Sequence, residues 1–356
     1  MPFETLPPVE YTEVGYAKSG WVARVTIERP EAYNAYSTRT LIELAAAFRE
    51  AAFDDGVAVI VFTGSGTSAF CTGGDVKEYE RVYTKTPRDY WKYMGLFSAY
   101  IESILNSGKP VIARLNGMAV GGGNEIHLAC DLSVIAEHAY VGQVGTKVGS
   151  VAAGGATQWL PIFVGDRRAR SMLLLNRPVP AYQALEWGLV NDVVPSVTKD
   201  GEFIVRATPE EIVRARKGQD GYGIDLSKLD ATVDALCEEL IDAFPECVRY
   251  TKQQTNFWKD LAWHQTVGHA RDWLSIHYTS FEPMEGMGAF VEKRPPGYRK
   301  LRDLAASGGS SEFAWGPYLK ACPSCDARFL PSLFRYCGRC GHALDGVQAA
   351  SAGSED

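Results

Sequence analysis

The chain has 356 residues, of which 46% are hydrophobic and 22% are charged, and its formal net charge is -7. This balance is ordinary for a globular protein, and the length allows one large domain or two smaller ones. The acidic balance argues against nucleic acid as the main partner. No apolar run approaches the roughly 18 residues of a membrane span, and the N-terminus lacks a signal peptide, so we expect a cytoplasmic protein without a membrane anchor.

Strands and helices are predicted to alternate along the first half of the chain. Residues 21–28 alternate apolar and polar side chains, which is typical of a strand, whereas 38–55 have apolar residues at helical spacing. Further strands are predicted at 56–64, 109–117 and 131–142, and further helices at 122–131, 165–176 and 180–188. Such alternation favours an α/β fold with a parallel sheet and crossover helices.

Composition divides the rest of the chain. Residues 196–225 are polar and predict an irregular insertion, 226–290 predict long helices, and ASGGSS at 306–311 is typical of a flexible linker. We therefore expect the following organisation: a core at 1–195, an insertion with a helical region at 196–305, a linker at 306–318, a cysteine module at 319–345, and a disordered tail at 346–356.

Two segments run from an apolar strand through glycines into a helix: VFTGSGTSAFCTGGDVKEY at 61–79 and NGMAVGGGNE at 116–125. Glycines before a helix leave backbone N–H groups uncovered, and such amides suit a developing oxyanion. Tight turns with close helix–strand packing are the alternative interpretation. A phosphate cradle is disfavoured, because no GxxxxGK[ST] pattern is present and GGGNE would direct a carboxylate at the phosphates.

Together with ERPEAYNAYS, KPVIARLNGMAVGGGNEIHLACD, VGQVGTKVGSVAAGGATQWLPIFVG and AYQALEWGLVNDVVP, these segments resemble the crotonase superfamily, also called enoyl-CoA hydratase/isomerase. The resemblance covers about residues 15–195 and, more loosely, the helices to about residue 300. It implies a ββα spiral core followed by a C-terminal helical region. It also implies an acyl-CoA thioester substrate, of which CoA is a part, no redox cofactor, and assembly as a homotrimer or homohexamer.

The resemblance also implies roles for single residues. The backbone N–H groups of Gly74 and Gly122 would form an oxyanion hole, and Glu125 would position water or move a proton, the alternative being an acid that complements the helix dipole. Asp75 is a second candidate acid or a helix cap, and Ser150 would hydrogen-bond a ring oxygen or serve a turn. The implied substrate-binding residues are Ala32, Phe70, Cys71, Gly73, Lys77, Gly121, Gly145 and Lys147.

The reaction is indicated by a departure from the hydratase pattern. Hydratases have a second glutamate in a stretch like GQPE, whereas GQVGTKVGS places Gly145 there. Dihydroxynaphthoyl-CoA synthases also have a KVGS-like run, but they typically place an aspartate shortly after it.

His127 lies two residues past Glu125, so we expect it in the core or at an interface rather than as a base.

The 6-oxocyclohex-1-ene-1-carbonyl-CoA hydrolases have close equivalents of SAFCTGGDVKEY, NGMAVGGGNEI, KVGSVAAGGATQWLP, IDLSKLD and AFPECV, and a similar insertion after Pro195. This closest resemblance implies water addition to a cyclic oxo-enoyl-CoA and hydrolysis of a C–C bond through an enolate. An enoyl-CoA hydratase/isomerase, a dihydroxynaphthoyl-CoA synthase-like enzyme and a non-catalytic scaffold are the alternatives.

Four cysteines near the C-terminus have the spacing of a zinc ribbon. Cys322-x2-Cys325 and Cys337-x2-Cys340 are separated by eleven residues, which predicts one structural Zn²⁺ held by four thiolates. Disulfides are disfavoured in the cytoplasm, and iron–sulfur spacing differs. The ribbon is not part of the crotonase pattern, and it could act as a lid, an oligomer clamp or a docking site for a protein partner.

Overall fold

A six-stranded sheet forms one layer of the core in the computed structural model, which describes residues 10–310, 312–313 and 315–344. Its strand order is β1-β2-β3-β5-β7-β10. β1 runs antiparallel to β2, and every other pair of neighbours is parallel. The strands are β1 (Val14–Ser19), β2 (Val22–Ile27), β3 (Val59–Gly64), β5 (Val111–Leu115), β7 (Leu132–Ala136) and β10 (Asp192–Val194).

A second sheet has four short strands in the order β4-β6-β8-β9. β4, β6 and β8 are parallel to one another, and each is the next strand after a member of the first sheet. The chain therefore gives one strand to each sheet before it enters a helix, which is the ββα spiral that the family resemblance implies. The strands are β4 (Ala69–Cys71), β6 (Met118–Val120), β8 (Tyr140–Gly142) and β9 (Val179–Pro180).

The central strands are apolar along their whole length because both faces of the first sheet are covered. In β3, Val59 and Val61 pack toward helix α9 (Ser227–Ile241), whereas Ile60 and Phe62 belong to the main core on the other side. Both side-chain sets are fully buried. A strand buried on two faces gives a continuous hydrophobic run rather than an alternating one.

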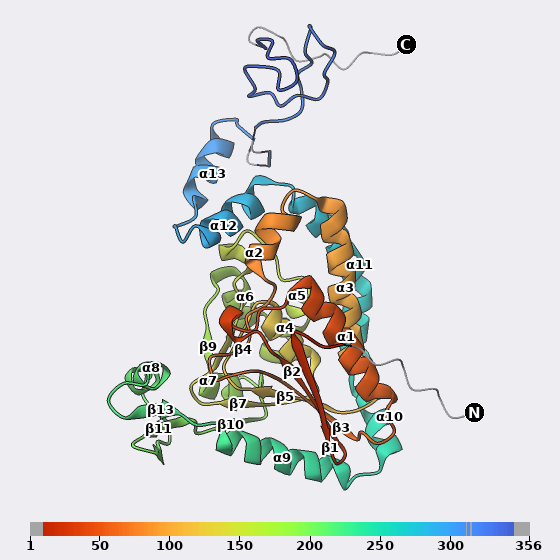
Figure 1. The fold of residues 1–356 in the computed structure, drawn as a ribbon, viewed down its shortest axis with the longest axis vertical. Coiled ribbons are helices and arrows are strands. Elements are labelled where there is room, and N and C mark those ends of the chain that lie inside the picture. The colour runs from red at the N-terminus through yellow and green to blue at the C-terminus, as the bar shows by residue number, and fades with distance from the viewer. Residues whose placement is uncertain (1–9, 311, 314, 345–356) are drawn as a thin grey trace, which may run out of the picture.

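Three long helices enclose the main core and lie side by side in Figure 1: α1 (Thr38–Phe53), α3 (Pro87–Leu105) and α11 (Phe257–His277). α1 begins at a capping box in which Ser37 and Thr40 satisfy each other's backbone N–H groups. The sequence pattern above assigns no element to α3, although eight of its residues are buried. The predicted strand over 131–142 is divided between β7 and β8.

Residues 196–225, predicted to be an irregular insertion, form an ordered unit, so the expectation of irregular structure is wrong. A three-stranded sheet in the order β12-β11-β13 packs with helix α8 around Val197, Ala215 and Tyr222. The core of this unit is small enough for a few apolar side chains to fill it. The mostly polar composition of residues 196–225 therefore gave no sign of an ordered unit. The elements are β11 (Val197–Lys199), β12 (Glu202–Phe203), α8 (Pro209–Lys217) and β13 (Tyr222–Ile224).

The C-terminal helices lead from the spiral to the cysteine module, which lies beyond α13 in Figure 1. The helices of this part are α10 (Pro245–Thr255), α12 (Phe281–Val291) and α13 (Tyr298–Ala306). The tail predicted to be disordered at 346–356 lies outside the described residues, as does the last residue of the predicted module. No described helix is both long and apolar enough to cross a bilayer.

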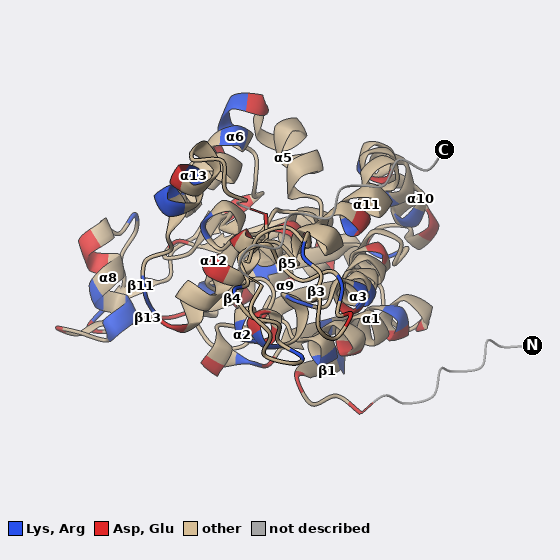
Figure 2. Ribbon diagram, turned by 90° about the horizontal axis from the view of Figure 1, so that it is seen from above, with Lys and Arg blue, Asp and Glu red and all other residues tan. Residues whose placement is uncertain are grey.

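Charged residues of both signs are interspersed on the outer helices (Figure 2). α8 carries acids in its first turn and bases in its last turn, which complements the helix dipole. On α6 (Asp166–Leu175) the carboxylate of Asp166 pairs with Arg170 one turn later, at 2.9 Å. Acidic and basic side chains thus occur together on these exposed helices, and their charges partly cancel.

Candidate active site

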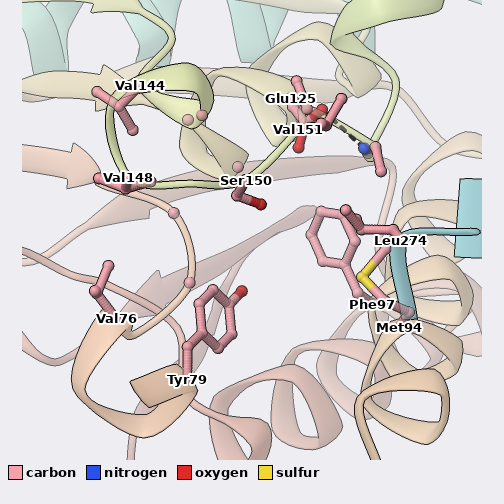
Figure 3. Close-up of a pocket in the computed structure, with 18 of the residues that line it drawn as sticks. Val76, Tyr79, Met94, Phe97, Glu125, Val144, Val148, Ser150, Val151 and Leu274 are labelled. Carbon is pink, nitrogen blue, oxygen red and sulfur yellow. Dashed lines mark hydrogen bonds between the residues drawn. The ribbon is translucent and has the colours of Figure 1, made fainter. Parts of the chain in front are cut away.

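A pocket lies beyond the ends of β4, β6 and β8 (Figure 3). The loops that follow these strands supply glycines and one carboxylate, and the segment from α2 (Val76–Glu78) to α3 supplies an aromatic wall. α11 and α12 complete the pocket on the C-terminal side. The lining residues include Tyr36, Gly73, Gly74, Tyr79, Tyr93, Met94, Phe97, Gly121, Gly122, Glu125, Gly145, Ser150, Leu274, Tyr278 and Met287.

Close contact between two glycine loops brings the amides of Gly74 and Gly122 to one place. A Cβ on Gly73 would lie only 2.9 Å from the Gly122 nitrogen, so the loop after β4 touches the start of α4 (Gly122–Ala129). Gly121 enters α4 with φ of 59°, in the region that favours glycine. The N–H groups of Gly74 and Gly122 have no acceptor in the described part of the chain, and each residue lines the pocket.

Glu125 lies in the first turn of α4 with only 4% of its surface exposed. Its Oε1 accepts hydrogen bonds from the backbone N–H groups of Gly154, at 2.7 Å, and Ala156, at 3.2 Å. Its other oxygen has no hydrogen-bond partner among the described residues, and the residue lines the pocket (Figure 3). Burial raises the pKa of Glu125 to about 7, although the two amides oppose the shift. A carboxyl with this pKa can accept and return a proton near neutral pH.

Hydroxyl groups dominate the polar part of the opposite wall. Ser150 Oγ lies 3.1 Å from the hydroxyl of Tyr278, and the hydroxyls of Tyr79 and Tyr93 are 2.7 Å apart. Burial raises the pKa of Tyr79 and Tyr93 well above the usual range and that of Tyr278 to about 12. These phenols therefore stay protonated at neutral pH and can donate hydrogen bonds.

The structure gathers seven of the predicted site residues around the pocket and leaves six outside its lining. Those in the lining are Gly73, Gly74, Gly121, Gly122, Glu125, Gly145 and Ser150. Phe70 and Cys71 are fully buried in the core behind it, and Ala32 is half-buried in a short 3-10 turn. Lys147 is exposed, and its hydrogen bonds to other described residues are made by its backbone: the N–H donates to the carbonyl of Val144 and the carbonyl accepts from the hydroxyl of Tyr298. Lys77 lies in a separate groove.

Asp75 shares that separate groove, and its contacts favour the helix-cap alternative over a catalytic role. Its carboxylate accepts hydrogen bonds from the N–H groups of Lys77 and Glu78 at the start of α2. It also pairs with Arg29 at 3.0 Å. These contacts engage the Asp75 carboxylate at the start of α2 and at Arg29, outside the pocket lining.

His127 is buried, as the sequence predicts for a core residue, and its ring nitrogens lie near Asn124 and Ser133. Burial lowers the pKa of His127 to about 4, so the ring is neutral at neutral pH.

Lys252 is another buried basic residue with a structural role. Its Nζ donates to Asp131 at 2.8 Å and lies within hydrogen-bond distance of three further oxygens.

The tyrosines of the pocket were missed by motif reasoning, because they come from four places in the chain. Tyr36 precedes α1, Tyr79 and Tyr93 flank the start of α3, and Tyr278 follows α11. The sequence did carry one signal, since YERVYTKTPRDYWKYMGLF at 79–97 is unusually rich in aromatic residues. Helical spacing over 90–97 would have placed Tyr90, Tyr93 and Phe97 on one face.

The four cysteine sulfurs of the C-terminal module lie within 4.8 Å of one another. Cys322 and Cys340 have sulfurs 3.6 Å apart, as do Cys325 and Cys337. Sulfurs bound to one tetrahedral zinc by bonds of about 2.3 Å would be about 3.8 Å apart, so the set fits such an ion. Disulfides would require about 2.05 Å.

Comparison with known proteins agrees with this geometry. Residues 17–215 match the family model described as enoyl-CoA hydratase/isomerase. A protein of Geobacter metallireducens named 6-oxocyclohex-1-ene-1-carbonyl-CoA hydrolase is 36% identical over 326 residues, which cover 85% of each chain. Proteins of the same name from Thauera aromatica and Syntrophus aciditrophicus are 35% and 33% identical, covering 83% and 82% of this chain and 84% and 82% of their own.

Solved structures show the same fold. The enoyl-CoA hydratase of Mycobacterium avium subsp. paratuberculosis superimposes with a TM-score of 0.65 at 25% identity, over 81% of this chain and 98% of that one. An enoyl-CoA hydratase/isomerase of Xanthobacter autotrophicus gives 0.63 at 25% identity, over 84% and 95%. The crotonase-type spiral expected from the sequence is therefore confirmed, and the chain belongs to the enoyl-CoA hydratase/isomerase family.

Proposed function

We propose that the protein is an acyl-CoA hydrolase that opens the ring of a cyclic oxo-enoyl-CoA thioester. Three relatives named as hydrolases of such a thioester support the substrate class. The observation that carries the proposal is the pocket's single carboxylate. Glu125 is the one acid among the described lining residues, and Gly145 stands where hydratases place a second.

The thioester oxygen would accept hydrogen bonds from the N–H groups of Gly74 and Gly122, which stabilise an enolate. One water adds across the C=C bond that is conjugated to the thioester. A second water then attacks the ring ketone and gives a proton to Glu125. The bond between the former ketone carbon and the carbon next to the thioester breaks, its electron pair forming the enolate. The enolate regains a proton from Glu125, which leaves an open-chain carboxylic acid two waters heavier.

Product masses from a panel of thioesters test this proposal. A cyclic 6-oxo-1-ene acyl-CoA should give a product two waters heavier, and a linear enoyl-CoA such as crotonyl-CoA should react poorly. Efficient hydration of crotonyl-CoA without ring opening of the cyclic thioester would contradict the proposal and leave the hydratase alternative. Family membership also supports that alternative, whereas the intact pocket argues against a non-catalytic scaffold.

The cysteine module would hold one structural Zn²⁺ through Cys322, Cys325, Cys337 and Cys340. Four thiolates around one ion supply folding free energy and leave no open position for a substrate. Metal analysis should give about one equivalent of zinc per chain. The same thiolates support a reducing compartment such as the cytoplasm.

Assembly and partners follow from exposed apolar side chains. Ile162 on α5 (Ala156–Val164) and Leu174 and Leu175 on α6 are each more than half exposed, which supports a homotrimer or homohexamer. Trp315, just before the cysteine module, and Phe329 within it are 63% and 77% exposed. Exposed aromatic residues on so small a unit support a protein partner at the module.

A further inference from the structure

Ser150 and Tyr278 form a hydrogen-bonded pair of hydroxyls inside the pocket, and the reaction described above leaves them unused. Their oxygens are 3.1 Å apart, and both residues line the pocket. Figure 3 shows the Ser150 side chain reaching into the space between Glu125 and Tyr79. Ser150 belongs to the loop after β8, whereas Tyr278 directly follows α11, so the pair joins two distant parts of the chain.

The pair is held in place from both sides. The ring of Tyr278 is fully buried and stacks on Tyr90 with centroids 3.6 Å apart and planes 15° apart. The ring nitrogen Nε2 of His277 lies 3.2 Å from the carbonyl oxygen of Gly149, next to Ser150. A Cβ on Gly149 would overlap the backbone of Glu282, so α12 presses on the same loop. Hydroxyls fixed in this way are preorganised for a ligand.

Hydrogen counting shows that the pair has a donor to spare. Two hydroxyls carry two protons, and one proton is used in the bond between Ser150 and Tyr278, while the Tyr90 hydroxyl that also bonds Tyr278 can supply its own proton. Tyr278 stays protonated at neutral pH, because burial raises its pKa to about 12. Met94, Phe97, Leu274 and Met287 make much of the nearby lining apolar. A free donor in such surroundings favours a substrate that brings its own acceptor.

The proposed substrate has two oxygens that need separate sites. The thioester oxygen would lie at the amides of Gly74 and Gly122, so the ring ketone must find donors elsewhere. A linear enoyl-CoA has no oxygen at this position and would gain nothing from the pair. A purely structural bond between the loop and α11 is the competing explanation.

We propose that Ser150 and Tyr278 bind the ring ketone oxygen and form a second oxyanion site during ring opening. When water attacks the ketone carbon, Glu125 takes its proton and the carbonyl electron pair moves to the oxygen. That oxyanion then accepts hydrogen bonds from both hydroxyls, because the proton that joins Ser150 and Tyr278 in the free pocket turns to the more strongly accepting oxyanion. The carbonyl re-forms as the ring C–C bond breaks, so no oxidant or reductant is consumed. This inference rests on the proposed ring opening and assigns a specificity role within it.

Two variants and a matched control test the pair. Tyr278→Phe preserves the stack on Tyr90 and removes one hydroxyl, and Ser150→Ala removes the other. Tyr100→Phe is the control, because the Tyr100 hydroxyl is buried outside the pocket and has no hydrogen-bond partner in the described part of the chain. All three should keep the melting temperature of the unmodified protein within a few degrees.

Product partition is the decisive measurement with the cyclic oxo-enoyl thioester. Each pocket variant should lose about 100-fold or more of the rate to the two-water product, the usual loss of one oxyanion donor. The one-water product, hydrated but unopened, should accumulate in its place. Equal losses of both products, or ring opening at the unmodified rate, would overturn the second oxyanion site.

Ligand binding separates this inference from the proposed function. Two saturated ring CoA thioethers that differ only in the ketone oxygen are the probes, because a thioether cannot form the enolate and its ring is therefore not opened. The unmodified protein should bind the ketone form about tenfold more tightly, and Tyr278→Phe should erase that difference. If the unmodified protein opened no ring, the proposed function would fail, but this ketone preference would still stand. Equal affinity for both probes in the unmodified protein would refute the inference directly.

Discussion

Replacing Glu125 with glutamine should stabilise the protein at alkaline pH while it removes activity. Glutamine has the same shape, and its amide oxygen can still accept from the N–H groups of Gly154 and Ala156, at 2.7 and 3.2 Å in the unmodified protein. Only the buried charge disappears. The residue therefore exemplifies a site at which catalysis is obtained at the expense of stability.

The magnitude follows from the pKa of Glu125, which burial raises from 4.5 to about 7. Because the folded state holds its proton more tightly than the unfolded chain, stability falls as the pH rises from about 4.5 to 7 and then levels off. By linkage, the ionised carboxyl costs about 1 kcal/mol at pH 5 and roughly 3 kcal/mol at pH 8. Glu125→Gln should lose this cost, so its advantage over the unmodified protein should grow with pH.

Denaturant unfolding at pH 5 and pH 8 measures the effect, with Glu43→Gln as an opposite control. Glu43 is also buried, and burial alone would raise its pKa, but the amides of Thr12 and Glu13 and the side chain of Arg39 hold that pKa below the usual value. Its stabilisation is present above the unfolded pKa of 4.5 and is lost only on acidification below it, so Glu43→Gln should weaken the protein by nearly the same amount at pH 5 and pH 8. A Glu125→Gln advantage that does not grow between the two pH values would refute the reasoning.

Enzyme kinetics complete the same test. If Glu125 accepts the proton of water, kcat/KM for ring opening should rise with pH through an apparent pKa near 7. Glu125→Gln should lower kcat by about two to four decades with little change in KM, and it should abolish that rising limb. A variant within threefold of the unmodified rate would move the proton transfer to another group.

Three further changes probe structural contacts outside the pocket lining. Cys325→Ser should remove the single zinc equivalent measured by metal analysis while ring opening persists; loss of activity on brief chelation, with the fold intact, would argue against a purely structural ion. Asp75→Ala should lower the free energy of unfolding by about 1 to 2 kcal/mol, by losing a helix cap and the pair with Arg29, yet keep kcat within threefold. Lys252→Met should cost about 3 to 5 kcal/mol in denaturant unfolding, because it leaves Asp131 without its buried partner.

Local sequence patterns predicted many strands and helices of the core because each repeat is local, whereas the spiral arrangement was implied by the family resemblance. Each apolar strand, glycine turn and following helix lies within about thirty residues, and the burial of β3 and β5 follows directly from their composition. The same locality placed Gly122 and Glu125 three residues apart at the start of α4. Residues in one turn of helix keep a fixed relation whatever the rest of the fold does.

The polar wall of the pocket could not be predicted in the same way. Ser150 and Tyr278 are 128 residues apart, and only the packing of α11 and α12 against the loop after β8 brings them together. Asp75 shows the converse: its position next to Gly74 suggested chemistry, but the start of α2 and Arg29 claim the carboxylate. The sequence shows which residues are neighbours along the backbone, but the packing of the surrounding elements decides the direction in which each side chain points.

The loop that carries Gly145, at the place of the second hydratase glutamate, also carries Ser150 of the hydroxyl pair. A Cβ on Gly145 would lie 2.9 Å from the carbonyl oxygen of Ser150 and 3.5 Å from the nitrogen of Ala152, so the loop folds back over the place of the absent acid. A side chain at position 145 would meet the backbone of the loop before it could reach the substrate ring. Gly145→Ala should therefore already displace Ser150 and lower ring opening, nearly as much as Gly145→Glu, while neither variant gains hydratase activity. Rates on the cyclic thioester and on crotonyl-CoA measure both effects. An alanine variant with unchanged ring opening would show that the loop can yield, and that the glycine is not what positions Ser150.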